Sequence, residues 1–417
     1  MTLGGGSTKP LRVLSVIPSM AQRTGGPATV MVHSTIALGD RVERVIVCTD
    51  AGAPAAAAHR AVSVEDMPAG AERLDIRVFP TKQPRKIGYS PELGRFLRSE
   101  VRSFDLVTIH SLNLYPQYAA YRAAKREGVP YLIVPHGALD PWLRSQRRVR
   151  KAGADLIFQR EMLERAPAIQ YTTDEEGRRA GVANPRGFVV PNGVSFDAVA
   201  APDGAGPRFR AEHGFASDEL LVTFLGRIAA KKGLDILIRA FAASAVVGRL
   251  QIVGPDDEGL TPQLRQVAAD AGVAERVSFM GPLYEGERAA ALAATDIWAL
   301  TSHTENFGNA VVEAMAASCP VVVSSGVNIA SDIATADAGI VVEATASSAA
   351  QGLSRLAEDP SLRAEVANRG KEFAERFAWP IVSAELLALY QATATGATGP
   401  GFPAALRPVG FTPRGGG

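Results

Sequence analysis

Short runs of aliphatic and β-branched residues alternate with longer segments of helical periodicity along most of the chain. A helix is expected from about Pro27 to Leu38, because proline suits the first helical turn. Strands separated by helical stretches favour parallel pairing, so the pattern predicts an α/β sheet. The strands expected in the first half are Val13–Ile17, Arg44–Cys48, Ile76–Phe79, Leu106–Ile109, Tyr131–Val134, Ile169–Tyr171 and Phe188–Val190.

A turn-rich segment, residues 191–208, interrupts this alternation and is typical of a linker. The alternation then restarts, so the sequence predicts two consecutive α/β domains, residues 10–200 and 201–375. Residues 1–9 and the Gly/Pro/Ala-rich stretch 393–417 are expected to be flexible. The second-half strands are expected at Leu221–Leu225, Leu250–Val253, Val277–Met280, Ile297–Leu300, Val321–Val323 and Ile340–Val342, and the helices at Asp235–Ala243, Thr261–Ala271, Glu285–Ala294 and Asn309–Ala317.

The composition fits a globular protein and excludes several classes. Of 417 residues, 47% are hydrophobic and 21% are charged, which excludes a wholly disordered or fibrous chain. A net charge of +1 gives no global attraction to nucleic acid, so none is expected as a partner. Cys48 and Cys319 lie too far apart for a metal-type spacing, and a reducing cytoplasm fits them.

The sequence predicts a cytoplasmic protein, with peripheral contact at the membrane left open. The apolar run Val13–Ile17 is shorter than the roughly 7–15 residues of a signal core, and no run reaches the roughly 18 residues of a membrane span. A basic run could meet an acidic lipid head group or a phosphorylated acceptor, or be a solvated helix. It contains Arg144, Arg147, Arg148, Arg150 and Lys151.

Three strand-end loops carry candidate chemistry. Gly25 and Gly26 precede the first helix, where glycine lets a ligand approach the backbone. Gly226-Arg227 and Lys232-Gly233 follow a strand, and two cations beside a helix start suit an anion. Glu305-Asn306-Phe307-Gly308-Asn309 leads into a helix that carries Glu313, so a carboxylate and helix N–H groups could meet a sugar or a phosphate; helix capping is the alternative.

Taken together, these motifs resemble the retaining GT-B glycosyltransferases of family 4, the group 1 enzymes. The two glutamates resemble their E-x7-E motif, and the Arg227–Gly233 segment resembles their G-R-x4-K-G element. Residues 135–142 resemble the H-G-x-L-D-P-W variant of a bacterial branch. The resemblance spans about residues 10–392 and is carried further by Asn192-Gly193-Val194, Phe279-x-Gly281, Ala314-Met315-Ala316 and a closing helix that contains Trp379.

The resemblance implies two Rossmann-like, doubly wound domains that face each other across a cleft, with residues 376–392 packing back on the first domain. It assigns Arg227 and Lys232 to the donor diphosphate and Glu313 to the ribose hydroxyls. Glu305 and His136 would lie at the transferred sugar. The other expected substrate contacts are Gly25, Gly26, His110, Phe307, Gly308 and Asn309.

The implied activity is transfer of a hexose from a nucleoside-diphosphate sugar to a glycan, lipid-linked or small-molecule hydroxyl, with retention, in bacterial surface polysaccharide biosynthesis. No D-x-D occurs in the chain, so no metal or other cofactor is expected. The segment Ser325–Ile333 departs from the family's G-G-x-x-E loop, and no role is transferred to it. A sugar-nucleotide epimerase and a non-catalytic two-lobed sugar-binding protein remain alternatives, whereas a dehydrogenase lacks its G-x-G-x-x-G.

Overall fold

The computed structural model describes residues 9–21, 26–52, 67–141, 158–182, 184, 186–397, 401–404 and 406–410. It forms two compact units, residues 1–193 with 379–417 and residues 194–378. The chain passes from the first unit to the second after residue 193, a few residues before the boundary expected near residue 200. The reason is that helix α8 (Phe196–Val199), inside the expected linker, already packs on α12 (Glu285–Ala293) of the second unit, as does the next helix, α9 (Ala205–His213).

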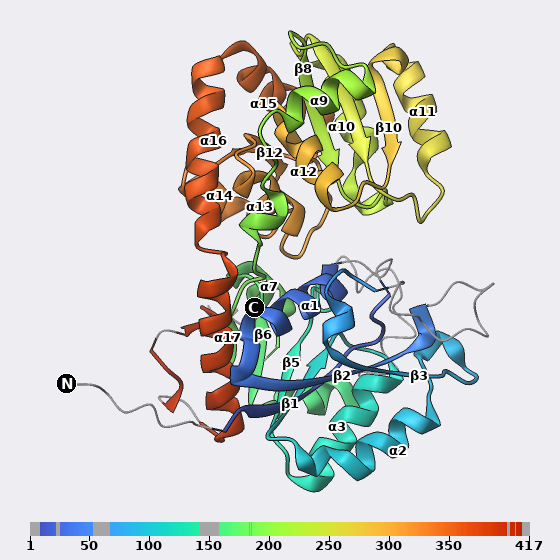
Figure 1. Ribbon diagram of the computed structural model, residues 1–417, viewed down its shortest axis with the longest axis vertical. Coiled ribbons are helices and arrows are strands. Elements are labelled where there is room, and N and C mark those ends of the chain that lie inside the picture. Colours follow the sequence, from blue (N-terminus) through green and yellow to red (C-terminus); the bar gives the residue numbers. More distant parts are fainter. Residues whose placement is uncertain are drawn as a thin grey trace, which may run out of the picture. The chain divides into compact units, whose positions relative to one another are not determined.

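The first unit is built on an eight-stranded sheet in the order β14-β7-β6-β5-β4-β1-β2-β3 (Figure 1). All its strand pairs are parallel except β14 with β7. Because β1 pairs with both β2 and β4, the winding direction of the sheet reverses there. The strands are β1 (Leu11–Val16), β2 (Val42–Thr49), β3 (Asp75–Phe79), β4 (Leu106–His110), β5 (Tyr131–Val134), β6 (Ala168–Tyr171), β7 (Gly187–Val189) and β14 (Arg407–Pro408).

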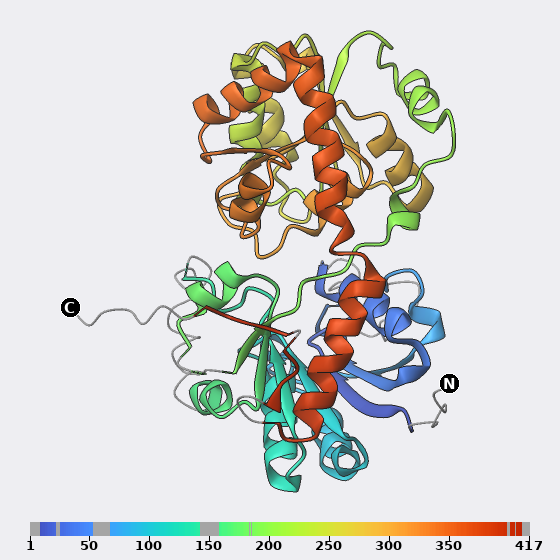
Figure 2. The ribbon, with the colours of Figure 1, turned by 90° about the vertical axis from the view of Figure 1, so that its left-hand side faces the viewer.

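Helices cover both faces of this sheet because alternate strand residues point to opposite sides. On one face, Val13 and Leu132 cluster with Trp379 and Leu386 of α17 (Trp379–Ala394), which Figure 2 shows lying over the strands; α1 (Gly26–Leu38) packs beside α17. On the other face, Leu14 joins the core made with α2 (Pro91–Glu100) and α3 (Tyr115–Glu127). Shorter helices are α6 (Arg160–Glu164) and α7 (Asp174–Ala180).

The second unit has a six-stranded, all-parallel sheet in the order β10-β9-β8-β11-β12-β13. Its strands are β8 (Leu220–Leu225), β9 (Gly248–Val253), β10 (Val277–Gly281), β11 (Ile297–Leu300), β12 (Val321–Ser324) and β13 (Ile340–Val342). Helix α10 (Leu234–Ala243) packs with α11 (Thr261–Asp270) and α15 (Ala346–Glu358), whereas α13 (Asn309–Ala316) packs with α8 (Phe196–Val199) and α16 (Pro360–Glu375). A six-residue helix, α14 (Ala330–Thr335), precedes β13.

Both units are therefore doubly wound α/β domains of the Rossmann type, as the strand pattern predicts. Every strand expected from the sequence is present, with ends within a few residues of the expected ones. Within the described ranges, every helix falls short of the length or the hydropathy that a membrane span requires.

The expectation of a flexible C-terminal tail is wrong for the part of residues 393–417 that the structure describes. β14 pairs antiparallel with β7, and the Val409 amide donates to the Gly187 carbonyl at 2.9 Å. Phe402, Leu406 and Val409 are buried. Spaced apolar side chains thus anchor a segment whose Gly and Pro content alone indicates disorder.

Replacing Phe402 by alanine tests this anchoring, because its ring packs on Phe188 with 4.3 Å between centroids. We expect Phe402→Ala to lower the free energy of unfolding by about 3–5 kcal/mol, measured by chemical denaturation. The control is Arg407→Ala, whose side chain is largely exposed and should change stability little. Equal stability of the two variants would show that the tail contributes nothing to the first unit.

Candidate active site at the strand ends

The candidate donor site of the second unit lies where its sheet reverses its winding direction. β8 pairs with β9 on one side and with β11 on the other, so the loops after β8 and β11 leave the same sheet edge and diverge. Such a switch point is where open α/β sheets bind ligands. Arg227 and Lys232 follow β8, and Glu305 follows β11.

An ion pair between Lys232 and Glu305 joins these two loops. Lys231 Nζ lies 3.4 Å from the same carboxylate oxygen, Glu305 Oε2. Burial acts to raise the pKa of Glu305, but the two ammonium groups outweigh it and lower that pKa to about 2. Burial lowers the pKa of Lys232 from its ordinary value, and the attraction of Glu305 opposes that shift. Glu305 is therefore charged at neutral pH.

Backbone contacts hold the two loops in the same position. The Thr301 hydroxyl donates to the Gly233 carbonyl at 2.7 Å, and the His303 amide donates to the Lys231 carbonyl at 2.9 Å. Gly233 has a φ of +60°, and a Cβ there would lie 2.3 Å from the Thr301 carbonyl oxygen. Only glycine fits this close approach.

The segment Ser325–Ile333, to which the family resemblance assigns no role, holds the backbone of Glu305 in place. The Glu305 amide donates to the Gly326 carbonyl at 2.9 Å, and the Asn328 amide donates back to the Glu305 carbonyl at 3.0 Å. The sequence could not indicate this contact, because the loop binds Glu305 through backbone atoms. A motif made of side chains does not reveal such a bond.

Arg227 is more accessible than Lys232. Its side chain is 40% exposed, against 14% for Lys232. Its nearest acidic partner is Asp257, with 3.7 Å between Nη1 and Oδ2. Of the two predicted phosphate ligands, Arg227 therefore offers the less neutralised charge.

Glu313 lies on α13 and has a partner that the sequence did not indicate. Arg288 of α12 donates to Glu313 Oε2 at 2.6 Å. Side chains on two different helices share no spacing signal, so this contact needed the structure. The bond orients the carboxylate and leaves Glu313 Oε1 as a further acceptor.

The remaining predicted donor-side residues form the start of α13. Gly308 is the N-cap of this helix and adopts a φ of +88°. Phe307 is buried, and its ring packs edge-on against Phe377 with 5.3 Å between centroids. Asn309 is the first helical residue. The positive end of the helix dipole therefore lies beside the Glu305 loop, an arrangement that suits negative charge.

The first unit holds a second group of predicted residues beside its own switch point, which lies between β1 and β4. His110 ends β4 and His136 follows β5. Their rings stack, and His110 Nδ1 lies 3.0 Å from His136 Nε2. Burial lowers the pKa of His110 well below its ordinary value, with the charges of His136 and Arg44 adding to the shift, and burial lowers the pKa of His136 to about 4. Both rings are neutral at pH 7.

The loop at His136 is held in an unusual backbone conformation. His136 has a φ of +51°, which is uncommon for a residue other than glycine. The Gly137 amide donates to Glu176 Oε1 at 2.7 Å, which anchors the loop to α7. Backbone strain of this kind is often found at functional sites.

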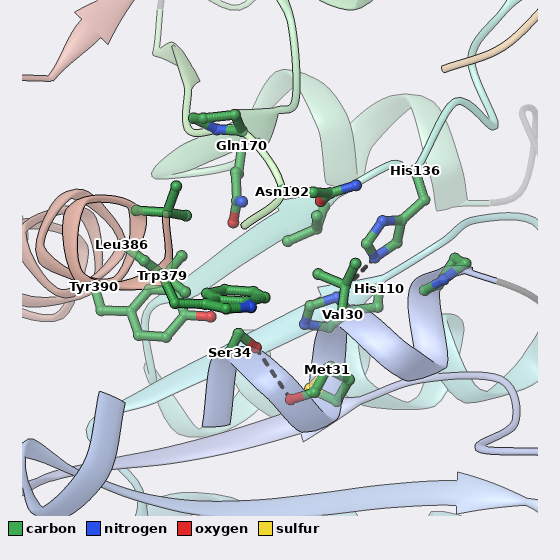
Figure 3. A pocket seen from close by; sticks show the side chains of 14 residues that line it. Val30, Met31, Ser34, His110, His136, Gln170, Asn192, Trp379, Leu386 and Tyr390 are labelled. Atoms are coloured by element: carbon green, nitrogen blue, oxygen red, sulfur yellow. Dashed lines mark hydrogen bonds between the residues drawn. The ribbon is translucent and has the colours of Figure 1, made fainter. Parts of the chain in front are cut away.

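A small cavity of about 20 Å³ borders the two histidines (Figure 3). Trp379, Tyr390, Gln170 and Asn192 also line it. Trp379 Nε1 is buried and has no hydrogen-bond partner among the described residues. The space is sufficient for a water molecule.

Of the remaining residues expected to contact a substrate or a membrane, the structure describes only some. Gly26 is the first residue of α1, whereas Gly25 and the basic run 144–151 lie outside the described residues. Among the residues that are described, no three His, Cys, Asp or Glu side chains are grouped so as to hold a metal ion.

The two domains match known families in order. Residues 25–193 match the glycosyl transferase 4-like domain, and residues 207–373 match the glycosyl transferases group 1. These matches define a two-domain enzyme that transfers glycosyl groups.

Full-length relatives place the chain within that class. A D-inositol 3-phosphate glycosyltransferase of Actinosynnema mirum is 30% identical over 320 residues, covering 70% of this chain and 75% of the relative. One from Rhodococcus opacus is 28% identical over 389 residues, covering 88% and 85%. The chain belongs to the group 1 glycosyltransferase family, and it is a glycosyltransferase.

Solved structures confirm the GT-B fold. HepE of Anabaena, crystallised with UDP and glucose, has a TM-score of 0.72 at 20% identity and covers 90% of this chain and 98% of its own. Sucrose-phosphate synthase of Thermosynechococcus elongatus has a TM-score of 0.72 at 18% identity, covering 93% and 100%. At this identity the likeness concerns the fold.

The Lys232–Glu305 pair should make stability depend on pH in a defined direction. Glu305→Gln leaves two cations without their shared carboxylate, and we expect it to destabilise the protein by about 3–5 kcal/mol at pH 7 in chemical denaturation. The pKa of Glu305 is lowered to about 2, against about 4.3 in an unfolded chain. The stabilisation is therefore present above about pH 5 and is lost as the pH falls towards 2.

The difference in the free energy of unfolding between the wild type and Glu305→Gln should therefore become smaller as the pH falls. Glu43→Gln is the matched control, because the exposed Glu43 lies 3.4 Å from Arg12 and such surface pairs contribute little. If this difference in the free energy of unfolding stays constant from pH 7 to pH 3, Glu305 is not charged in the folded protein.

Proposed function

We propose that the protein is a retaining glycosyltransferase that moves a hexose from a nucleoside-diphosphate sugar to a hydroxyl acceptor. The observation that carries this proposal is the charge arrangement at the second switch point, where Arg227 and the Lys232–Glu305 pair lie beside the N-terminus of α13. Such preorganised cations and amides stabilise the negative charge that develops on a departing diphosphate. The UDP and UDP-glucose bound to the HepE structures are consistent with this donor class.

The environment of Glu305 argues against a covalent route. A carboxylate with a pKa of about 2, held by two lysines, is a weak nucleophile and a weak base. Its role is then to position Lys232 and to balance its charge. A same-face displacement, in which the departing diphosphate helps to deprotonate the acceptor, fits retention better, with His136 in contact with the transferred sugar.

The acceptor is proposed at the level of its class. A glycan, lipid-linked or small-molecule hydroxyl fits the family, and surface polysaccharide assembly in the cytoplasm is the proposed setting. The names of the relatives add an inositol phosphate to the small-molecule candidates. Peripheral contact with the inner membrane face is proposed as well. A groove of about 500 Å³ on α2 and α3 offers Arg98 and Arg122 for it, whereas its Lys125 and Arg126 form ion pairs with Glu161 and Glu127.

Donor binding tests the proposal directly. A thermal-shift panel of sugar nucleotides should identify one that stabilises the protein selectively. We expect Glu313→Ala to weaken binding of that donor by about 1–3 kcal/mol in calorimetry, because it removes an acceptor for ribose hydroxyls. Glu275→Ala, an exposed residue of the same unit, is the control. Unchanged donor affinity in folded Glu313→Ala would refute the assigned role.

The same charges predict catalysis without a metal ion. With Arg227 and Lys232 meeting the diphosphate, we expect sugar transfer to continue after dialysis against EDTA. The measurement is product formation from the identified donor, with and without added Mg²⁺ or Mn²⁺. Loss of activity on chelation, restored by either ion, would contradict a diphosphate held by protein cations alone.

A further inference from the structure

A chain of hydrogen bonds crosses the first sheet at its switch point and ends at His136. The Thr108 hydroxyl of β4 donates to Ser15 Oγ of β1 at 2.8 Å. Thr108 Oγ1 also lies 3.0 Å from His110 Nε2. The other ring nitrogen of His110 lies 3.0 Å from His136 Nε2 (Figure 3). Four polar side chains from three neighbouring segments are therefore connected in a row.

The parallel register of the strands explains this alignment. Ser15 and Thr108 are paired residues of β1 and β4, so their side chains share one face of the sheet. His110 lies two residues beyond Thr108 on the same strand and points to the same face. The three side chains are buried, and His110 is only 7% exposed, so these groups must satisfy one another.

The bond from Thr108 to Ser15 determines which atom donates in each of the other hydrogen bonds of the row. Thr108 has one hydroxyl proton, which it gives to Ser15, so it accepts a proton at its oxygen from His110 Nε2–H. A neutral imidazole carries one N–H, so His110 Nδ1 is an acceptor. His136 Nε2 must then donate to it. The proton of His136 is thereby placed on Nε2, and Nδ1 keeps its lone pair.

We infer that Thr108 and His110 are positioning residues that fix His136 in its Nε2–H tautomer, with Nδ1 as a hydrogen-bond acceptor. His110, expected from the sequence to contact substrate, has both ring nitrogens engaged by protein groups. The buried Arg44 guanidinium disfavours a second proton on His110, and burial disfavours one on His136. If His136 contacts the sugar, which rests on the proposed function, a sugar hydroxyl donates to Nδ1 rather than accepting from it.

The test is nitrogen-15 NMR of histidine-labelled protein without substrate, near neutral pH. The long-range couplings of each ring report which nitrogen carries the proton, and His136→Gln identifies the His136 signals among the six histidines. We expect the Nε2–H pattern at His136 in the wild type. A proton on Nδ1 would overturn the inference.

Two substitutions at Thr108 separate positioning from packing. Thr108→Val keeps the shape but removes the hydroxyl, and it should convert His136 to a mixture of tautomers. Thr108→Ser keeps the hydroxyl and should preserve the wild-type pattern. If folded Thr108→Val leaves the His136 tautomer unchanged, Thr108 does not set it and the inference fails.

Activity then tests the link to function separately. With His136 at the sugar, kcat/KM should fall by about 10–100-fold in Thr108→Val, as it does on loss of a group that orients a metal-binding imidazole, and it should recover in Thr108→Ser. A tautomer that changes in Thr108→Val while transfer stays at the wild-type rate would confirm the hydrogen-bonded row and reject the proposed place of His136 at the sugar.

Discussion

The parallel direction of the strands is the constraint on which the rest of this structure depends. All strands of the second sheet, and all but β14 of the first, run the same way. Every loop that follows a strand therefore leaves its sheet at one edge, and the two switch points open that edge where neighbouring loops diverge. Residues as distant in sequence as Lys232 and Glu305, or Ser15 and Thr108, come into contact for this reason.

Charge at the edge of the second sheet is stabilised by contacts inside that unit. The Lys232–Glu305 pair joins two loops, and the backbone of residues 326–328 holds the carboxylate side of that pair. Removing charges from water is costly unless partners and hydrogen bonds compensate, and here both are supplied. The donor diphosphate that we propose for this site would meet charges that are already in place.

Periodicity predicted the elements well because each strand is a short buried run between turn residues. Tyr131–Val134 and Ile297–Leu300 begin and end where the pattern places them. The tail escaped prediction because Phe402 and Val409 are isolated apolar residues in a Gly/Pro-rich stretch, and their partners lie far away in sequence. Propensity describes a segment alone, whereas burial depends on what the fold brings beside it.

The residues of the candidate site could be predicted from the sequence, but their partners could not. Motifs indicated which residues carry charge, including Arg227 and Glu313, but their partners came from other elements. Arg288 lies on a different helix from Glu313. The row that ends at His136 depends on strand register. Neither relation can be read from spacing along one segment.

The discontinuity of the first unit has a consequence for synthesis. Its chain is interrupted after Gly193 by the entire second unit and resumes at Trp379, whose ring packs directly on Gly193. On the ribosome, residues 194–378 are complete before α17 emerges. Until then, the face of the first sheet that includes Val13 and Leu132 lacks its partners Trp379 and Leu386. The domain that begins the chain is therefore the last to finish folding, and a nascent protein stalled before residue 379 exposes an apolar surface that chaperones recognise.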